Sequence, residues 1–202
     1  MSSHEPETRT RILEATWRLM EQRQGQNVRM QDIAKAAGIS RQAVYLHFAS
    51  RTDLLVATAH YVDEVRGLDE RKSRWRSATS GVELLEAYVD FWGNYIPEIY
   101  GMAKALLPVL ETDEAAAAAW NDRMTAVRES CRHTIEVLQS EGMLASEWTG
   151  EEATELLWTM LSVRNWEQLT LGCGWSAFEY VNRMQKLVKR TFVQVSESDR
   201  AS

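Results

Sequence analysis

Four times along this 202-residue chain, a serine or threonine stands three positions before an acidic residue at the head of an amphipathic run. The four segments are Ser50–Asp53, Ser80–Glu83, Thr149–Glu152 and Ser176–Glu179. In such a capping box the hydroxyl accepts a hydrogen bond from a helix N–H that lacks another partner, and the acid reaches back to the helix start. One box can arise by chance, but four in helical register predict an all-α chain.

The composition agrees with this prediction and excludes several other classes. Three prolines and ten glycines are too few for a sandwich or barrel built on many tight turns. No run of apolar residues is long enough to span a membrane, and residues 1–7 lack the apolar core of a signal peptide. The two cysteines, Cys131 and Cys173, cannot form a disulfide framework. We therefore expect a soluble, cytoplasmic, mostly helical protein.

Apolar periodicity and helix breakers divide the chain into about nine expected helices. Their ranges are 6–23, 30–37, 40–47, 51–66, 81–96, 97–109, 113–140, 150–171 and 176–195. Pro97 is expected to end the fifth helix, and the polar, basic stretch 67–80 is expected to be a loop or a frayed helix end. Residues 1–55 are predicted to form one domain, and residues 56–202 a second, larger one.

Charge is unevenly distributed between these two parts. Residues 1–55 hold eight Arg or Lys and six Asp or Glu, which gives a net charge of +2. The remaining residues hold fifteen basic and twenty-three acidic side chains, which gives −8. A slightly basic head on an acidic body fits local contact with a polyanion.

The stretch 30–48 has the spacing of two short helices joined by a tight turn. Ala34 and Ala37 are small, so a second helix can cross the first closely. Gly38 supplies the left-handed backbone that ends the first helix, and Ser40 is a favourable N-cap for the second. This is the layout of a helix-turn-helix, whose second helix fits the major groove of DNA.

The residues of this stretch also follow a known family pattern in order and spacing. They are Thr10–Ala15, Ile33–Ala34, Ala37–Ser40, Tyr45–Phe48, Arg51 and Leu54–Leu55. Over residues 8–56 the chain resembles the DNA-binding head of the TetR family of transcriptional regulators. The family usually has a threonine where Arg29 stands, as the cap of the second helix, so here Asn27 or solvent is expected to take over that cap.

The chemistry of the second helix suggests a role for each outward-facing residue. Arg41 suits guanine and Gln42 suits adenine, while Ala43 is small enough to touch a thymine methyl. The hydroxyl of Tyr45 and the ring of His47 suit phosphate oxygens, although both could equally be half-buried packing residues with a wet tip. Arg51 lies at a helix N-terminus, which adds to its attraction for phosphate, and the resemblance implies the same phosphate role for Tyr45, His47 and Arg51. The predicted DNA-binding set is Ser40, Arg41, Gln42, Ala43, Tyr45, His47 and Arg51.

The resemblance further implies a small-molecule cavity inside the body, between the fourth and eighth helices. Seven of the eight tryptophans lie beyond residue 70, and they could line such a cavity or simply fill a helical core. The candidate lining residues are His60, Trp92, Tyr95, Met102, Leu106, Trp120, Met124, Trp158, Leu161 and Trp166. Arg164 and Asn165 are candidate polar anchors for a ligand.

The last two helices carry apolar stripes that a monomer could bury within itself. The resemblance implies instead that these helices pair with their copies in a four-helix dimer seam. A dimer also meets a physical need, because one recognition helix reads too few base pairs for specific binding.

An enzyme is the rival interpretation, and the sequence gives it little support. His60 and Glu64 are spaced as a metal pair on a helix, but no third ligand has a matching spacing. A helical protein-binding adaptor would leave Arg41, Gln42 and Tyr45 without a task. We therefore predict a non-enzymatic, cofactor-free regulator, a repressor that binds a palindromic operator as a homodimer and is released by a small, largely apolar or aromatic effector.

Overall fold

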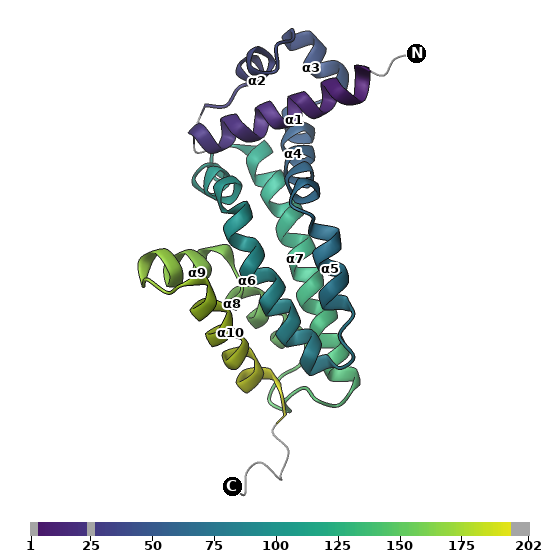
Figure 1. Ribbon diagram of the computed structural model, residues 1–202, viewed down its shortest axis with the longest axis vertical. Helices are drawn as coiled ribbons and strands as arrows, with labels where there is room; N and C mark the ends of the chain where they lie inside the picture. Colours follow the sequence, from purple (N-terminus) through teal and green to yellow (C-terminus); the bar gives the residue numbers. More distant parts are fainter. Residues whose placement is uncertain (1–3, 24–26, 195–202) are drawn as a thin grey trace, which may run out of the picture. The chain divides into compact units, whose positions relative to one another are not determined.

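The computed structural model describes residues 4–23 and 27–194 (Figure 1), and these residues form an all-α fold, as predicted. Ten α-helices are present within the described ranges. They are α1 (His4–Arg23), α2 (Met30–Ala36), α3 (Arg41–His47), α4 (Arg51–Val65), α5 (Leu68–Arg76), α6 (Gly81–Leu106), α7 (Glu114–Ser140), α8 (Gly150–Met160), α9 (Val163–Glu167) and α10 (Ala177–Phe192). A 3₁₀ turn (Leu107–Val109) follows α6, and a π-helical turn (Gln168–Gly172) follows α9.

Within the described ranges, no helix combines the length and apolarity needed to cross a membrane.

All four predicted capping signals start a helix. α4, α6, α8 and α10 begin directly after Ser50, Ser80, Thr149 and Ser176. Each hydroxyl accepts a hydrogen bond from the N–H three residues on, at 3.0–3.2 Å. At α8 and α10 the acid completes the box, because Glu152 accepts from the Thr149 N–H and Glu179 from the Ser176 N–H. Hydrogen bonds from the Thr149 hydroxyl and N–H lower the pKa of Glu152, and those from the Ser176 N–H and hydroxyl lower that of Glu179, since they favour the charged carboxylate.

Two of the predicted helix limits between residues 67 and 109 were wrong. The stretch 67–80 contains helix α5, whose Leu68 and Trp75 are buried; these two apolar anchors outweigh the polar surface that suggested a loop. Pro97 does not end a helix either, and α6 continues through it. Pro97 faces solvent, while the adjacent Tyr95 and Ile96 are fully buried, so packing of the apolar face offsets the missing backbone hydrogen bond.

The single helix predicted over 150–171 is divided in the structure. α8 ends at Met160, and Ser162 caps the start of α9 by accepting a hydrogen bond from the Asn165 N–H at 3.2 Å. The Asn165 side chain donates to the Thr159 carbonyl at 2.7 Å and thereby satisfies one carbonyl at the end of α8. This division and the addition of α5, set against the merging of two predicted helices into α6, give ten helices where about nine were expected.

The described residues pack into two compact units. The first combines the chain up to Leu68 with Ile99–Met124, and the second combines Asp69–Glu98 with the chain from Thr125 onward. The core of the first unit is aliphatic, and its fully buried members include Ile12, Ile33, Val44, Leu54 and Leu55. This core holds α1 to α4 together and so positions the predicted DNA-binding residues.

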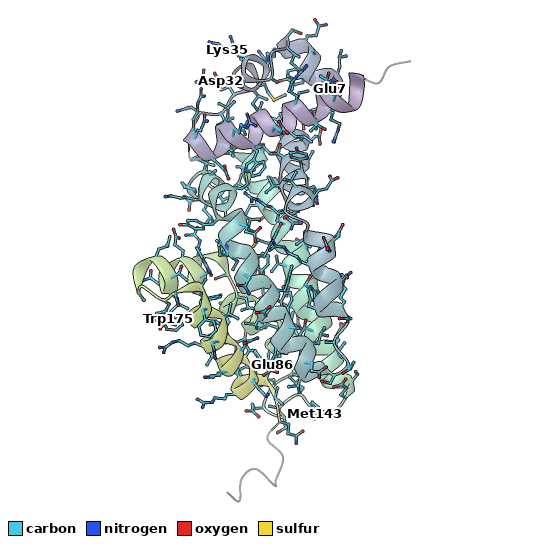
Figure 2. All side chains as sticks on the ribbon, in the orientation of Figure 1. Glu7, Asp32, Lys35, Glu86, Met143 and Trp175 are labelled. Atoms are coloured by element: carbon cyan, nitrogen blue, oxygen red, sulfur yellow. The ribbon has the colours of Figure 1, made fainter. Side chains whose placement is uncertain are left out.

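The core of the second unit is aromatic. Trp75 and Tyr88 meet edge to face with ring centroids 5.2 Å apart, and Phe91 stacks on Tyr95 at 5.8 Å. α10 packs closely against α6 at Gly93, where an added Cβ would lie 2.8 Å from the Val181 side chain. An ion pair of 3.0 Å between Lys189 of α10 and Glu86 of α6, the latter labelled in Figure 2, supports the same contact.

Candidate nucleic-acid interface and effector region

The turn between α2 and α3 is built as the sequence predicts. Gly38 has a φ of +69°, in the left-handed region that favours glycine. The Ile39 N–H donates to the Ala34 carbonyl at 3.0 Å, and Ser40 caps α3 by accepting from the Ala43 N–H at 3.0 Å. α3 is anchored from below by Val44, which is fully buried, so its other face is held in place and left open.

The start of α2 is stabilised by a residue that the sequence reasoning overlooked. Among the described residues, no side chain, Asn27 included, takes the place of the threonine hydroxyl; instead Asp32 accepts a hydrogen bond from the Arg29 N–H at 3.3 Å and from the Arg23 side chain at 3.0 Å. These two donors hold the pKa of Asp32 below its usual value. The acid three residues after Arg29 was the available signal. Lys35, on the same helix (Figure 2), is exposed.

The predicted base-reading residues lie on the open face of α3. Arg41 and Gln42 are exposed and Ala43 is half-buried. The Arg41 guanidinium donates to the Tyr45 hydroxyl at 3.5 Å and lies 5.6 Å from the centre of its ring, so the two side chains support each other. The structure thus brings Arg41, Gln42 and Tyr45 together on the exposed side of α3.

Two further residues of α3 complete this surface. His47 is half-buried, in keeping with a packed ring that has one accessible edge. Leu46 was not among the candidates, yet it is 83% exposed and is the most exposed large apolar side chain among the described residues. Its place between Tyr45 and His47 on a short helix was the signal that could have found it.

Arg51, the remaining candidate, is engaged at the first position of α4. Its Nε donates to the Val28 carbonyl at 3.1 Å, and its terminal nitrogen forms an ion pair with Asp113. The Asp113 carboxylate also caps α7, since it accepts from the N–H groups of Ala115 and Ala116 at 3.1 and 3.2 Å. The ion pair therefore links the first residue of α4 to the residue that caps α7.

A crevice of about 570 Å³ opens beside this ion pair, within the first unit. Its lining includes Arg29, Arg41 and Arg51 from the helix-turn-helix region. The connection between α6 and α7 contributes Thr112 and Asp113. The crevice is therefore rich in positive charge and can accept an anion.

The effector candidates of the second unit are tightly packed. Trp92, Tyr95, Leu161 and Trp166 are all at most 6% exposed, and Trp158 is half-buried. The Trp92 indole donates to the Leu161 carbonyl at 2.7 Å, so this tryptophan has a partner for its one polar group. By contrast, the Tyr180 hydroxyl is buried without a hydrogen-bond partner among the described residues.

The other effector candidates belong to the first unit. Met102 and Leu106 are buried in its core, and Trp120 and Met124 are half-buried. His60 is exposed, and its Nε2 lies 2.9 Å from a carboxylate oxygen of Asp122 on α7. The candidate set is thus divided between the two units.

No metal centre is present in the described part of the chain, where no group of three or more His, Cys, Asp or Glu has a suitable arrangement.

Apolar side chains remain exposed on the predicted dimerisation elements. Leu171, Phe178 and Leu187 are 62%, 76% and 48% exposed. On α10, Val181 and Met184 face inward and are buried, so the stripe predicted from the sequence is shared between the core of the second unit and the surface.

The comparisons with known proteins agree with this geometry. Residues 12–58 match the family model described as "Bacterial regulatory proteins, tetR family". A search of curated proteins finds no significant match to the sequence.

Solved structures with the same fold cover nearly the whole chain. A transcriptional regulator from Saccharomonospora viridis in complex with choline is 21% identical, with a TM-score of 0.71, over 95% of this chain and 100% of its own. A TetR-family regulator from Rhodococcus sp. is 22% identical, with a TM-score of 0.71, over 92% and 98%. NalD of Pseudomonas aeruginosa, a repressor of the MexAB-OprM multidrug efflux pump, is 18% identical, with a TM-score of 0.68, over 95% and 100%. At these identities the likeness establishes the fold.

A helix-turn-helix of this kind is a DNA-binding motif, whose second helix fits the major groove. Residues 12–58 match the helix-turn-helix model of the TetR family, and the chain as a whole shares the fold of solved TetR-family regulators.

Proposed function

We propose that this protein is a transcriptional repressor that binds DNA as a homodimer and releases it when a small effector binds. The observation that carries the proposal is the exposed, polar face of α3, on which Arg41, Gln42 and Tyr45 project from a helix anchored by a fully buried Val44. A rigid helix with donors on its first turn is suited to entering a major groove.

The first turn of α3 would read the bases. Arg41 can form two hydrogen bonds with guanine, Gln42 can do the same with adenine, and Ala43 can contact a thymine methyl. Ser40, Tyr45, His47 and Arg51 surround this turn and would bind phosphates, which fix the register of the protein on DNA without reading sequence.

A second copy of the chain would double the recognised site. Leu171, Phe178 and Leu187 offer apolar surface on the two elements that the family resemblance assigns to the dimer seam. Two-fold symmetry of the protein requires a palindromic operator, with half-site centres separated by about 10 base pairs or a multiple of that spacing.

The effector would be a small, largely apolar or aromatic molecule. The candidate residues supply aromatic surface from Trp92 and Tyr95 and adaptable methionine surface from Met102 and Met124. The regulator from S. viridis was crystallised with choline, and NalD regulates a multidrug efflux pump. Small-molecule response in this chain is consistent with both.

Release of DNA by an effector requires that the effector distinguish two shapes of the protein. It lowers DNA affinity only by the ratio of its affinities for the DNA-binding and the non-binding shape. α4 is the element suited to this coupling, because it carries Arg51 at its start and His60 near its end.

Selection of DNA duplexes from a random library by the purified protein tests the proposal. We expect enrichment of a palindrome, bound by the dimer with a Kd of about 0.01–10 nM. Candidate effectors can then be screened by thermal shift and tested for displacement of the enriched duplex. A folded protein that enriches no sequence, or that sediments as a monomer at micromolar concentration, would contradict the proposal.

A further inference from the structure

The Arg51 guanidinium has two possible anionic partners, the Asp113 carboxylate and a DNA phosphate. It is suited to binding a DNA phosphate, yet in the structure it forms an ion pair with Asp113. The side chains of Arg51 and Asp113 are only 24% and 21% exposed, so water screens this pair less than an open surface pair. A single guanidinium cannot neutralise a carboxylate and a phosphate equally well at the same time.

Asp113 is well placed to control Arg51. It is the one acid among the residues that line the crevice, which also include three arginines. Its backbone and side chain are fixed because it caps α7 through the N–H groups of Ala115 and Ala116. These two hydrogen bonds tie the position of the carboxylate to the start of α7.

α7 is attached to α4 at two further points. His60 of α4 pairs with Asp122 at 2.9 Å, and Asp63 of α4 pairs with Arg123 at 2.7 Å. Asp63 is buried, so the second pair resists separation. Three side-chain contacts thus connect α4 with α7 and the residue that caps it, and Arg51–Asp113 is the one that involves a predicted phosphate-binding residue.

We propose that Asp113 is a positioning residue for DNA binding, which holds Arg51 on the α6–α7 connection and competes with a DNA phosphate for its guanidinium. The inference rests on the proposed DNA-binding function and extends it to a residue outside the helix-turn-helix. Through Asp113, the position of the start of α7 sets how freely Arg51 can reach DNA.

The Asp113→Asn variant tests the competition without removing the helix cap. Asparagine caps helices about as well as aspartate, so α7 should keep its start while the carboxylate charge is lost. We expect DNA affinity to rise by about two- to tenfold. The rise should be equal on a selected duplex and on an unrelated 30-base-pair duplex, because a phosphate contact carries no sequence information.

Glu114→Gln is the matched control. Glu114 follows Asp113, is exposed and has no ion pair among the described residues, so this variant removes one negative charge from almost the same place. Its effect on DNA affinity should be clearly smaller than that of Asp113→Asn. In an Arg51→Ala background, Asp113→Asn should do no more than Glu114→Gln.

Fluorescence anisotropy with both duplexes, at fixed salt and with folding verified by circular dichroism, separates the outcomes. Equal effects of Asp113→Asn and Glu114→Gln, or weaker DNA binding by Asp113→Asn, would overturn the competition while leaving DNA binding intact. Failure of the folded wild type to bind either duplex would reject the proposed function itself and the competition with it. A double-mutant cycle of Arg51→Ala and Asp113→Asn in urea unfolding gives an independent measurement, and a coupling of zero would also overturn the inference.

Discussion

The helix-turn-helix and the aromatic core of the second unit use their side chains in opposite ways. α2 and α3 are seven residues each, bury small and aliphatic side chains, and leave polar groups such as Arg41 and Gln42 exposed. The second unit buries its largest side chains, including Trp75, Tyr88 and Trp92. The comparison teaches that the predicted base-contacting side chains lie on the surface. In the second unit, by contrast, an effector would have to bind among side chains that are already packed together.

This difference has an energetic side. Removal of an exposed side chain from α3 should change binding but hardly affect folding, because that side chain adds little to the core. Removal of a ring from the second unit should mainly change folding, because the loss of buried contacts leaves a cavity. The predictions below test this separation of binding from stability.

The largest expected effect is that of Trp92→Ala on stability. Trp92 is 3% exposed and its indole donates to the Leu161 carbonyl, so the variant loses ring contacts and leaves that acceptor without its donor. We expect a loss of about 3–5 kcal/mol in the free energy of unfolding, measured by urea denaturation. The control is Leu46→Ala on the exposed face of α3, with an expected change within about 0.5 kcal/mol. If the two variants lost similar amounts of unfolding free energy, the proposed difference between the exposed face of α3 and the core of the second unit would be wrong.

Arg41→Ala should show the reverse behaviour. We expect a loss of about 1–3 kcal/mol in binding to the selected duplex and relaxed specificity at one base pair, with no measurable change in the urea midpoint. The measurement is anisotropy on duplexes substituted at each position of the half-site. An equal loss of affinity on every duplex would show that Arg41 contacts phosphate only. Arg41 would then fix the position of the protein on DNA without reading a base.

The same contrast explains what could be predicted from the sequence. The turn at Gly38, the cap at Ser40 and the open face of α3 follow from residues within a few positions of one another. The start of α2 was predicted at the right residue, but its stabilising contact was not, because Asp32 accepts the Arg29 N–H from three residues further along the chain. Local signals also failed at Pro97 and in α5, where buried Tyr95 and Trp75 decide the structure through packing against distant segments.

Contacts over long sequence separations were beyond local reasoning. Arg51 pairs with Asp113, sixty-two positions away, and Trp92 bonds to Leu161, sixty-nine positions away. No motif marks either pair, because each depends on which helices come together. For this reason the effector candidates were chosen mainly by residue type, whereas all DNA-binding candidates except Arg51 could be assigned to one short helix and its cap.

Arg51→Ala should change the salt dependence of DNA binding. If Arg51 neutralises a phosphate, the slope of log affinity against log salt should become shallower by about 0.9, on selected and unrelated duplexes alike. Anisotropy titrations between about 50 and 200 mM salt measure this slope. An unchanged slope would remove Arg51 from the phosphate-binding set, while the contrast between surface and core would stand.

The smallest expected effect concerns pH, and it compares a helix cap in each region. Hydrogen bonds from the Arg29 N–H and the Arg23 side chain lower the pKa of Asp32 in the head, and bonds from the Ser176 N–H and hydroxyl lower that of Glu179 at the start of α10. Because each folded-state pKa lies below the unfolded value, the stabilisation is present above the unfolded pKa and is lost as the pH falls through the folded pKa.

Asp32→Asn and Glu179→Gln should therefore lower Tm slightly at neutral pH, and the difference from wild type should shrink as the pH falls from about 5 toward about 3. Glu151→Gln, an exposed neighbour of a capping glutamate, serves as the control for the loss of a surface charge. Thermal unfolding followed by circular dichroism across this range provides the measurement. A difference that persists at the lowest pH would show that the cap acts through packing and not through the charged carboxylate. Both carboxylates accept a hydrogen bond from a backbone N–H at the start of a helix. We therefore expect a similar pH profile in the two regions even though their cores differ.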